Sequence, residues 1–169
     1  MLKIALNLIH LSKFKKDIIS NINWLLLGTT IIFNSFTTNS QAQSNSITVN
    51  SSIAKDPLVV EGTSGGRAIA KEITQTENTA TGYCDGYVRP QPNHVLELES
   101  FFESLRLEVE SPADTTILIK GPGGVWCNDD TSSANPMIEG QWQPGIYQVW
   151  IGSYQANSNN EYQIRITGK

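Results

Sequence analysis

LRLEVES, at residues 105–111, decides the fold class of this chain. Leu105, Leu107 and Val109 alternate with charged residues, so one face of the segment is apolar and the other is polar. Near the end of the chain, YQIRIT at 162–167 shows the same alternation. A period of two indicates a strand that buries one face. Both segments are therefore predicted to be strands that cover a core.

Four more strands are predicted, with turn-forming residues between them. They lie at 57–60, 94–99, 115–120 and 146–151, and the turns are RPQPN (89–93), SPAD (111–114), GPGG (121–124), TSSANP (131–136) and QPG (143–145). Short strands separated by such turns predict an all-β fold, an antiparallel β-sandwich or a barrel.

Two segments fit this pattern less well. ESFFESL at 99–105 has apolar residues at helical spacing, but it lies between two alternating runs and is interpreted as a wide hairpin connection. RAIAKEIT at 67–74 is interpreted either as a turn region or as a short helix.

Residues 1–42 are predicted to be a cleaved secretory signal. Lysines precede the apolar run WLLLGTTIIF at 24–33, and SQA at 40–42 places small residues at the −3 and −1 positions of a cleavage site. The apolar run is shorter than the roughly 20 residues that span a bilayer. An uncleaved anchor that begins at Ile18 is the alternative, although Asn21 and Asn23 interrupt it.

Cleavage after Ala42 leaves residues 43–169, which are predicted to be secreted, periplasmic or at the cell surface without a membrane span. Residues 43–56 are interpreted as a tail or linker, or as an added edge strand, and 57–169 as one β-sandwich domain. The leader carries four lysines and one aspartate, so its removal changes the net charge from −4 to −7. An acidic domain of this kind is not expected to bind nucleic acid or an anionic membrane.

Cys84 and Cys127 are the two cysteines of the chain. In an oxidising compartment they are predicted to form a disulfide, which would close a loop of about 40 residues and stabilise the fold by about 3–4 kcal/mol. Two free thiols are the alternative.

A serine hydrolase is the catalytic alternative. GTSGG at 62–66 matches the G-x-S-x-G pattern around a nucleophilic serine, with Ser64 as nucleophile and His94 as base. The helices and parallel strands that a nucleophile elbow requires are not predicted, so a plain glycine-rich turn is favoured. The sequence also lacks HExxH, Walker and CxxC motifs, and the protein is predicted not to be an enzyme.

GPGGVWCNDD at 121–130 combines a tight turn with acidic residues. Calcium prefers oxygen ligands, and a hairpin at this turn would bring candidate ligands together. The candidates are Asp114, Asn128, Asp129 and Asp130. The alternative is that the two adjacent acids only accept hydrogen bonds from backbone N–H groups of the following turn.

Two tryptophans are predicted to contact a ligand. If Tyr147, Val149 and Ile151 face the core, Trp150 faces the opposite way, and Trp126 lies in the glycine-rich segment. The alternative is that the tryptophans fill the core and that Trp126 packs beside the disulfide.

From residue 114 onward the sequence resembles the bacterial pre-peptidase C-terminal (PPC) domain. The resemblance is carried by DTTILIKGPGGVWCNDD, NPMIEGQWQPGIYQVWIGSY and EYQIRIT, and specifically by Asp114, Asp129, Asp130, Gly145, Tyr147, Val149, Ile151, Tyr162, Ile164 and Ile166. It covers 114–169 and extends more loosely back to His94.

This resemblance implies a β-sandwich of jelly-roll-like character. PPC domains usually accompany secreted peptidases as non-catalytic extensions, and some relatives bind collagen, chitin or calcium. The expected function is therefore a non-catalytic secreted binding or accessory module for an extracellular polysaccharide, protein or envelope component. A purely structural envelope protein is a further alternative.

Overall fold

The computed structural model of the chain describes residues 45–54, 56–131 and 133–169. The predicted signal at 1–42 lies outside the described residues. The elements are β1 (Asn45–Val49), η1 (Ser51–Ala54), β2 (Leu58–Thr63), β3 (Ala68–Ile69), α1 (Ala70–Thr74), β4 (Asn78–Thr79), β5 (Gly82–Tyr83), β6 (Tyr87–Val88), β7 (His94–Leu98), β8 (Phe102–Glu110), β9 (Thr115–Gly121), β10 (Gly124–Asn128), β11 (Met137–Trp142), β12 (Gly145–Ser153) and β13 (Glu161–Gly168).

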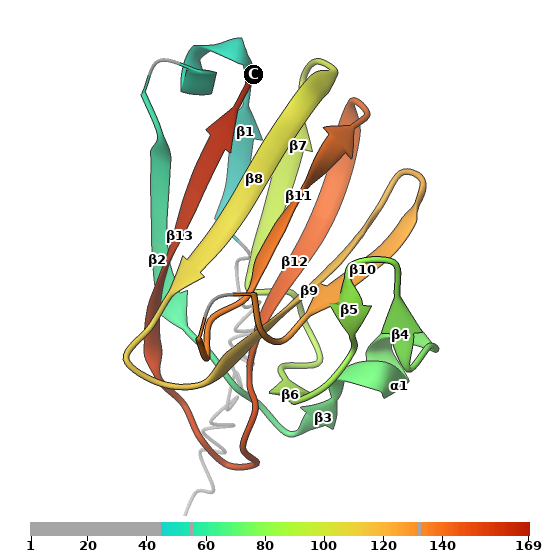
Figure 1. The fold of residues 1–169 in the computed structure, drawn as a ribbon, viewed down its shortest axis with the longest axis vertical. Helices are drawn as coiled ribbons and strands as arrows, with labels where there is room; N and C mark the ends of the chain where they lie inside the picture. The colour runs from blue at the N-terminus through green and yellow to red at the C-terminus, as the bar shows by residue number, and fades with distance from the viewer. Residues whose placement is uncertain (1–44, 55, 132) are drawn as a thin grey trace, which may run out of the picture. The chain divides into compact units, whose positions relative to one another are not determined.

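Two main sheets pack face to face as a sandwich, which confirms the predicted fold class (Figure 1). The first sheet has seven strands, with the path β1-β7-β12-β6-β3, and β9 joins it beside β12 with β10 on its far side. The second sheet has four strands in the order β11-β8-β13-β2. A separate two-stranded ribbon consists of β4 and β5. One pairing departs from the antiparallel prediction, because β1 runs parallel to β7.

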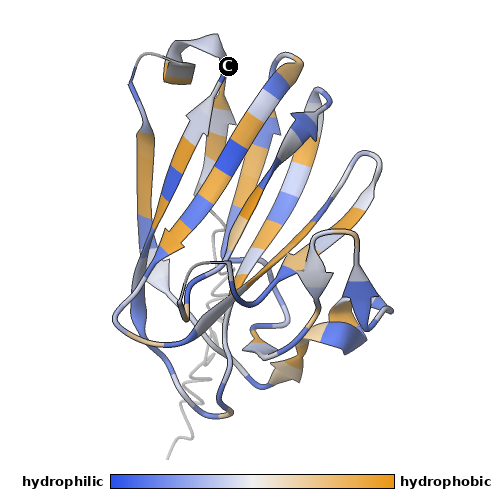
Figure 2. Cartoon of the chain, in the orientation of Figure 1, coloured by the Kyte–Doolittle hydropathy of each residue, from blue (hydrophilic) through white to orange (hydrophobic). Residues whose placement is uncertain are grey.

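The alternating segments form the strands that the sequence predicts. Leu107 lies opposite Ile166 and Val109 opposite Ile164, and all four side chains are buried between the sheets. Figure 2 shows the resulting alternation of apolar and polar residues along β8 and β13. Burial of these side chains, at about 1.5–3 kcal/mol each, is the main favourable contribution to the fold.

Residues 45–54 are not a linker. β1 adds an edge strand to the first sheet beside β7, and Val49 and Ile53 are buried in the main core. Of the two interpretations of 43–56, the added strand is therefore the one that the structure supports for the described part of this segment.

The connection from β7 to β8 is not a hairpin. β7 belongs to the first sheet and β8 to the second, so residues 99–101 carry the chain from one layer to the other. Phe102 is buried at the start of β8, whereas Phe101 is exposed. The helical spacing of ESFFESL thus reflects the crossover between the two sheets.

Residues 67–74 include a helix, as one interpretation of this segment predicts. α1 has five residues and ends at Thr74; the next residue, Gln75, has a left-handed backbone (φ 62°), and its N–H donates to the Lys71 carbonyl. None of the helices within the described ranges is long and apolar enough to cross a membrane.

Candidate ligand-binding site

The GPGG turn forms the predicted hairpin, but the segment after it is a strand. Gly121 pairs with Gly124 across the turn, and β10 continues antiparallel to β9 as far as Asn128. This pairing places Trp126 opposite Ile119, on the side of the main core, and Cys127 opposite Leu118, on the outer face of the first sheet. Segment 121–130 is therefore mostly an edge strand and only partly a loop.

Cys84 and Cys127 form the predicted disulfide, with an S–S distance of 2.05 Å. The disulfide ties β10 to residues 67–88, which we call the covering segment. Its two ends, β3 and β6, join the first sheet, and the part between them packs on the outer face of that sheet. Side chains of this segment also bond the edge of β10. Thr81 Oγ1 donates to the Cys127 carbonyl at 2.8 Å, and the Cys127 N–H donates to Thr79 Oγ1 at 3.1 Å.

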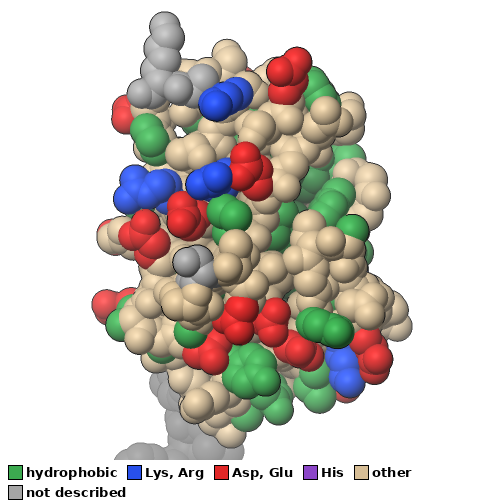
Figure 3. All heavy atoms as spheres, viewed as in Figure 1, with side chains coloured by type: hydrophobic (Ala, Val, Ile, Leu, Met, Phe, Trp, Pro, Cys, Tyr) green, Lys and Arg blue, Asp and Glu red, His purple; other side chains and the backbone are tan. Residues whose placement is uncertain are grey.

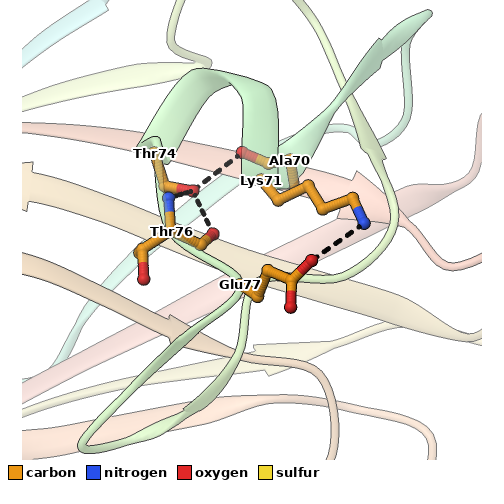
Figure 4. A network of polar contacts seen from close by, with 5 residues as sticks. All are labelled: Ala70, Lys71, Thr74, Thr76 and Glu77. Atoms are coloured by element: carbon orange, nitrogen blue, oxygen red, sulfur yellow. Dashed lines mark hydrogen bonds and ion pairs between the residues drawn. The ribbon is translucent and has the colours of Figure 1, made fainter.

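α1 is held within the covering segment by local polar contacts (Figure 4). Thr74 Oγ1 lies 3.1 Å from the Ala70 carbonyl and 2.9 Å from the Thr76 carbonyl, and Lys71 pairs with Glu77 at 3.5 Å. The helix is fixed to the sheet by Lys120, whose Nζ donates to the Ile73 carbonyl at 3.2 Å. These contacts keep Ala70 and Ile73 over the first sheet.

The prediction that Trp150 contacts a ligand is corrected by the covering segment. Trp150 faces away from the main core, as the alternation along β12 predicts, but only 3% of it is exposed. It packs in a second apolar cluster with the disulfide, Val88 and Leu118. Strand parity predicted the direction of the side chain correctly, whereas the layer that covers it is formed by a distant segment.

Trp126, by contrast, lies half-buried at the open edge of the sandwich. Its ring stacks on Trp142 at a centroid distance of 5.9 Å and an interplanar angle of 24°, and Tyr147 lies 6.2 Å away. Trp142 and Tyr147 contact each other at 4.8 Å and are buried. The alternative that Trp126 packs beside the disulfide is not observed, because Trp126 lies on the opposite side of β10.

A recess of about 110 Å³ opens beside these rings, and we call it the aromatic recess. It is lined by Thr81, Trp126, Ile138, Glu139, Gly140, Gln141, Trp142 and Tyr147. Pockets for drug-sized ligands are usually about 300–1,000 Å³, so this recess suits a single side chain or one edge of a sugar ring. Trp142 was not singled out from the sequence, because no local pattern shows that β11 and β10 meet at this edge.

Glu139 at the rim of the recess is already paired within the second sheet. Ser104 Oγ and Arg106 donate hydrogen bonds to its carboxylate at 2.8–3.0 Å. The hydrogen bonds from Ser104 and Arg106 hold the pKa of Glu139 below its usual range. The rim therefore offers hydrogen-bonding groups with little net charge, which suits a neutral ligand.

The predicted calcium ligands are brought near one another only in part. Burial and the carboxylates of Asp130 and Asp129 raise the pKa of Asp114, so these three acids are close enough to interact. The Asn128 amide oxygen, however, accepts hydrogen bonds from Thr131 and from the Met137 N–H. Asp129 Oδ1 accepts from the N–H of the adjacent Asp130, which precedes the turn that the alternative interpretation names.

Calcium binding at these residues stays a prediction. Calcium takes six to eight oxygen ligands, and one of the four predicted donors is used inside the fold. Within the described ranges, no group of three or more His, Cys, Asp or Glu side chains is arranged to hold a metal ion.

The serine-hydrolase arrangement is not formed. Ser64 is fully buried, and its Oγ bonds Ser153 Oγ at 3.0 Å and the Asn160 N–H at 3.1 Å. His94 is also buried, and its Nε2 lies 2.7 Å from Tyr162 Oη. Burial lowers the pKa of His94 and raises that of Tyr162, so this pair is neutral. Neither residue has the access to substrate that nucleophilic catalysis requires.

Comparison with known proteins gives similarities of fold and one sequence relative. No protein-family model matches the chain. An uncharacterized protein of Synechococcus elongatus is 28% identical over 88 residues, which cover 50% of this chain and 65% of that protein. The match thus spans less than two thirds of the relative's length.

Several solved structures resemble the chain, among them a PPC domain and a lysozyme inhibitor. The PPC domain of a collagenase from Bacillus anthracis has a TM-score of 0.43 and 8% identity, and the match covers 73% of this chain and 96% of that domain. PliG from Aeromonas hydrophila, a periplasmic inhibitor of g-type lysozyme, has a TM-score of 0.39 and 8% identity, with 75% and 99% covered. A PPC domain is thus among the structures similar to this chain. At these scores the similarities assign neither a family nor a function.

Proposed function

We propose that this protein is a non-catalytic binding or accessory module that acts outside the cytoplasm on an extracellular polysaccharide or protein. The disulfide supports an oxidising location, because structural disulfides are rare in the cytosol. Cleavage after Ala42 and a jelly-roll-like arrangement of the strands are part of the same proposal. Burial of Ser64 and His94 in separate hydrogen-bond pairs speaks against the hydrolase alternative.

The half-buried ring of Trp126 is the observation that carries the binding role. It is held at the edge of the sandwich by two buried aromatic rings, so it is rigid as well as accessible. Rigid aromatic side chains lose little conformational entropy on binding and provide a large apolar contact. The Thr81 and Gln141 side chains at the recess add neutral hydrogen-bonding groups beside that contact.

A co-sedimentation assay with insoluble chitin, peptidoglycan and collagen tests this proposal. We expect wild-type protein to be retained by one of these polymers and Trp126→Ala to be released, with Trp126→Phe intermediate. Tyr154→Ala is the matched control. Tyr154 is 50% exposed and follows the last residue of β12, whereas Tyr147, which lines the aromatic recess, lies near the first. Equal retention of wild type and a folded Trp126→Ala variant would contradict the proposed site. Failure of all three polymers to retain wild type would favour the purely structural alternative.

A further inference from the structure

The outer face of the second sheet has no layer packed over it among the described residues. The ends of β2, β13 and β8 on this face form an open groove of about 720 Å³, which we call the acidic groove. Its polar lining includes Glu61, Thr63, Glu110, Ser111, Glu161 and Gln163. This groove is separate from the aromatic recess, and the two share no lining residue.

Strand register explains why acids from three strands meet here. Gln163 on β13 lies opposite both Glu61 on β2 and Glu110 on β8. Glu161, two residues before Gln163, projects from the same face and lies opposite Thr63. Because side chains at i and i+2 share one face of a strand, the three carboxylates all line the groove.

The negative charge of the groove is only partly compensated. Glu110 pairs with Arg165 at 3.5 Å, and Glu61 accepts a hydrogen bond from the neutral Gln163 at 2.9 Å. Within the described part of the chain, the Glu161 carboxylate has neither an ion pair nor a side-chain hydrogen bond. Two of the three carboxylates therefore face solvent without a cationic partner.

The negative region continues beyond the groove. Asn135, which also lines the groove, bonds Thr115 Oγ1 and the Ser111 carbonyl, and Asp114 directly precedes Thr115. Burial together with Asp130 and Asp129 raises the pKa of Asp114, so like charges accumulate at this end of the molecule. Figure 3 shows acidic side chains gathered in the lower part of the view, below the strands of the second sheet.

We propose that the acidic groove binds an extended, basic segment of a partner protein. Adjacent strands are about 4.8 Å apart, so a groove across three strands is about 10 Å long and accommodates three to four residues of extended chain. Lys or Arg side chains at alternate positions of that segment then lie about 7 Å apart on one side, which matches the roughly 7–8 Å between diagonal neighbours such as Glu61 and Glu161. Complementary charge of this kind sets the orientation of a bound segment and speeds its association.

The groove suits a peptide better than a metal ion. Its volume is several times that of the aromatic recess, and it is open along its length. The described residues also contain no group of three carboxylate, imidazole or thiolate side chains arranged around one metal position.

Fluorescence anisotropy with the labelled peptide KVKVK tests the proposal. We expect wild-type protein to bind this peptide, to ignore EVEVE, and to lose affinity as salt is raised, because exposed charges are screened beyond about 10 Å at 0.1 M. The double variant Glu61→Gln/Glu161→Gln should bind KVKVK roughly tenfold more weakly, a change of about 1.4 kcal/mol.

Glu97→Gln/Glu99→Gln is the matched control, because it also removes two negative charges, but from exposed positions outside the groove. We expect its affinity to stay within about twofold of wild type, as rim charges far from a contact contribute little. If both double variants weaken KVKVK binding equally, the peptide is attracted by net charge alone, and the proposal that the groove binds it is overturned. Full competition by spermidine at the peptide's own concentration would show a site for small cations, and would also overturn the proposal. Trp126→Ala should bind KVKVK normally, so loss of polymer binding leaves this inference intact.

Discussion

His94 illustrates how a residue that suggests catalysis can serve the fold. Its imidazole is 3% exposed, bonds Tyr162 Oη at 2.7 Å, and meets the tyrosine ring edge to face at a centroid distance of 5.9 Å. Burial lowers the pKa of the imidazole below its ordinary value of 6.5. The folded protein therefore holds His94 neutral, whereas the unfolded chain takes up a proton near pH 6.5.

This difference predicts a loss of stability as pH falls. A group with a depressed folded pKa binds fewer protons in the native state, so its contribution to stability is complete above the unfolded pKa of 6.5 and decreases below it. We expect the free energy of unfolding to fall between pH 6.5 and the lowered pKa, with a slope of at most about 1.4 kcal/mol per pH unit. Urea denaturation at a series of pH values measures this slope.

His94→Gln is the variant that isolates the effect. Gln keeps a polar group near Tyr162 but does not titrate, so the slope in this pH window should disappear while the variant loses some stability at pH 8. Asp114, whose pKa is raised, changes stability in the opposite direction, because a raised folded pKa stabilises the native state as pH falls. An unchanged slope in the variant would assign the pH dependence to other groups.

At the scale of elements, the covering segment and its disulfide act as one unit. The Cys84–Cys127 bond closes a separation of 43 residues, joins the covering segment to β10 and lies in one apolar cluster with Trp150 and Val88. In the chain-entropy description, a loop of this length stabilises the folded state by about 4 kcal/mol. The bond also fixes the covering segment, which shields Trp150 from water.

Removal of the disulfide should therefore loosen this segment first. In Cys84→Ser/Cys127→Ser we expect unfolding stability to fall by about 3–4 kcal/mol. We also expect faster proteolysis within 67–88 and a red shift of tryptophan fluorescence that is lost in a Trp150→Phe background. Thr81→Val is the milder comparison, because it removes one hydrogen bond to Cys127 and should cost about 1 kcal/mol without opening the segment. Cleavage spread evenly over the whole chain would contradict local opening.

The strands and the covering segment together show which features the sequence predicts and which it does not. The alternation at 105–111 and 162–167 predicts strands and their buried faces correctly, because strand parity is a local property. The burial of Trp150 depends on residues 67–88, and the meeting of Trp126 with Trp142 depends on which strands form the edges of the sandwich. Both are contacts between distant segments, and alternation within one strand carries no information about them.

The sequence does not predict the acidic groove, and the reason is related. Glu61, Glu110 and Glu161 are far apart in the sequence, and each alone is typical of a solvated strand face. Only the register of β2, β13 and β8 brings them together. The disulfide, by contrast, was predictable from the count of two cysteines, because no other intramolecular pairing exists.

At the scale of the whole molecule, like charges gather at one end of the sandwich. Asp114, Asp129 and Asp130 repel one another at the end of β9 and β10 that is opposite the GPGG turn. Repulsion of this kind destabilises the folded state, and bound or condensed cations relieve it. Calcium binding at these residues stays a prediction, with Asn128 removed from the expected ligand set by its hydrogen bonds to Thr131 and Met137.

A thermal melt in excess calcium and then in excess chelator tests this prediction. A ligand present at about 100 times its Kd that binds only the folded state stabilises it by roughly 2.7 kcal/mol, which shifts Tm by several degrees in a domain of this size. We expect calcium to raise Tm of the wild type and to leave Asp129→Asn/Asp130→Asn unchanged. Because that variant also loses like-charge repulsion, its Tm in chelator should be at or slightly above that of wild type. Magnesium at the same ionic strength is the control, since general screening by divalent cations would raise Tm equally with either metal. Identical wild-type melts in calcium and in chelator would exclude calcium binding and leave the three acids as part of the negative surface beside the groove.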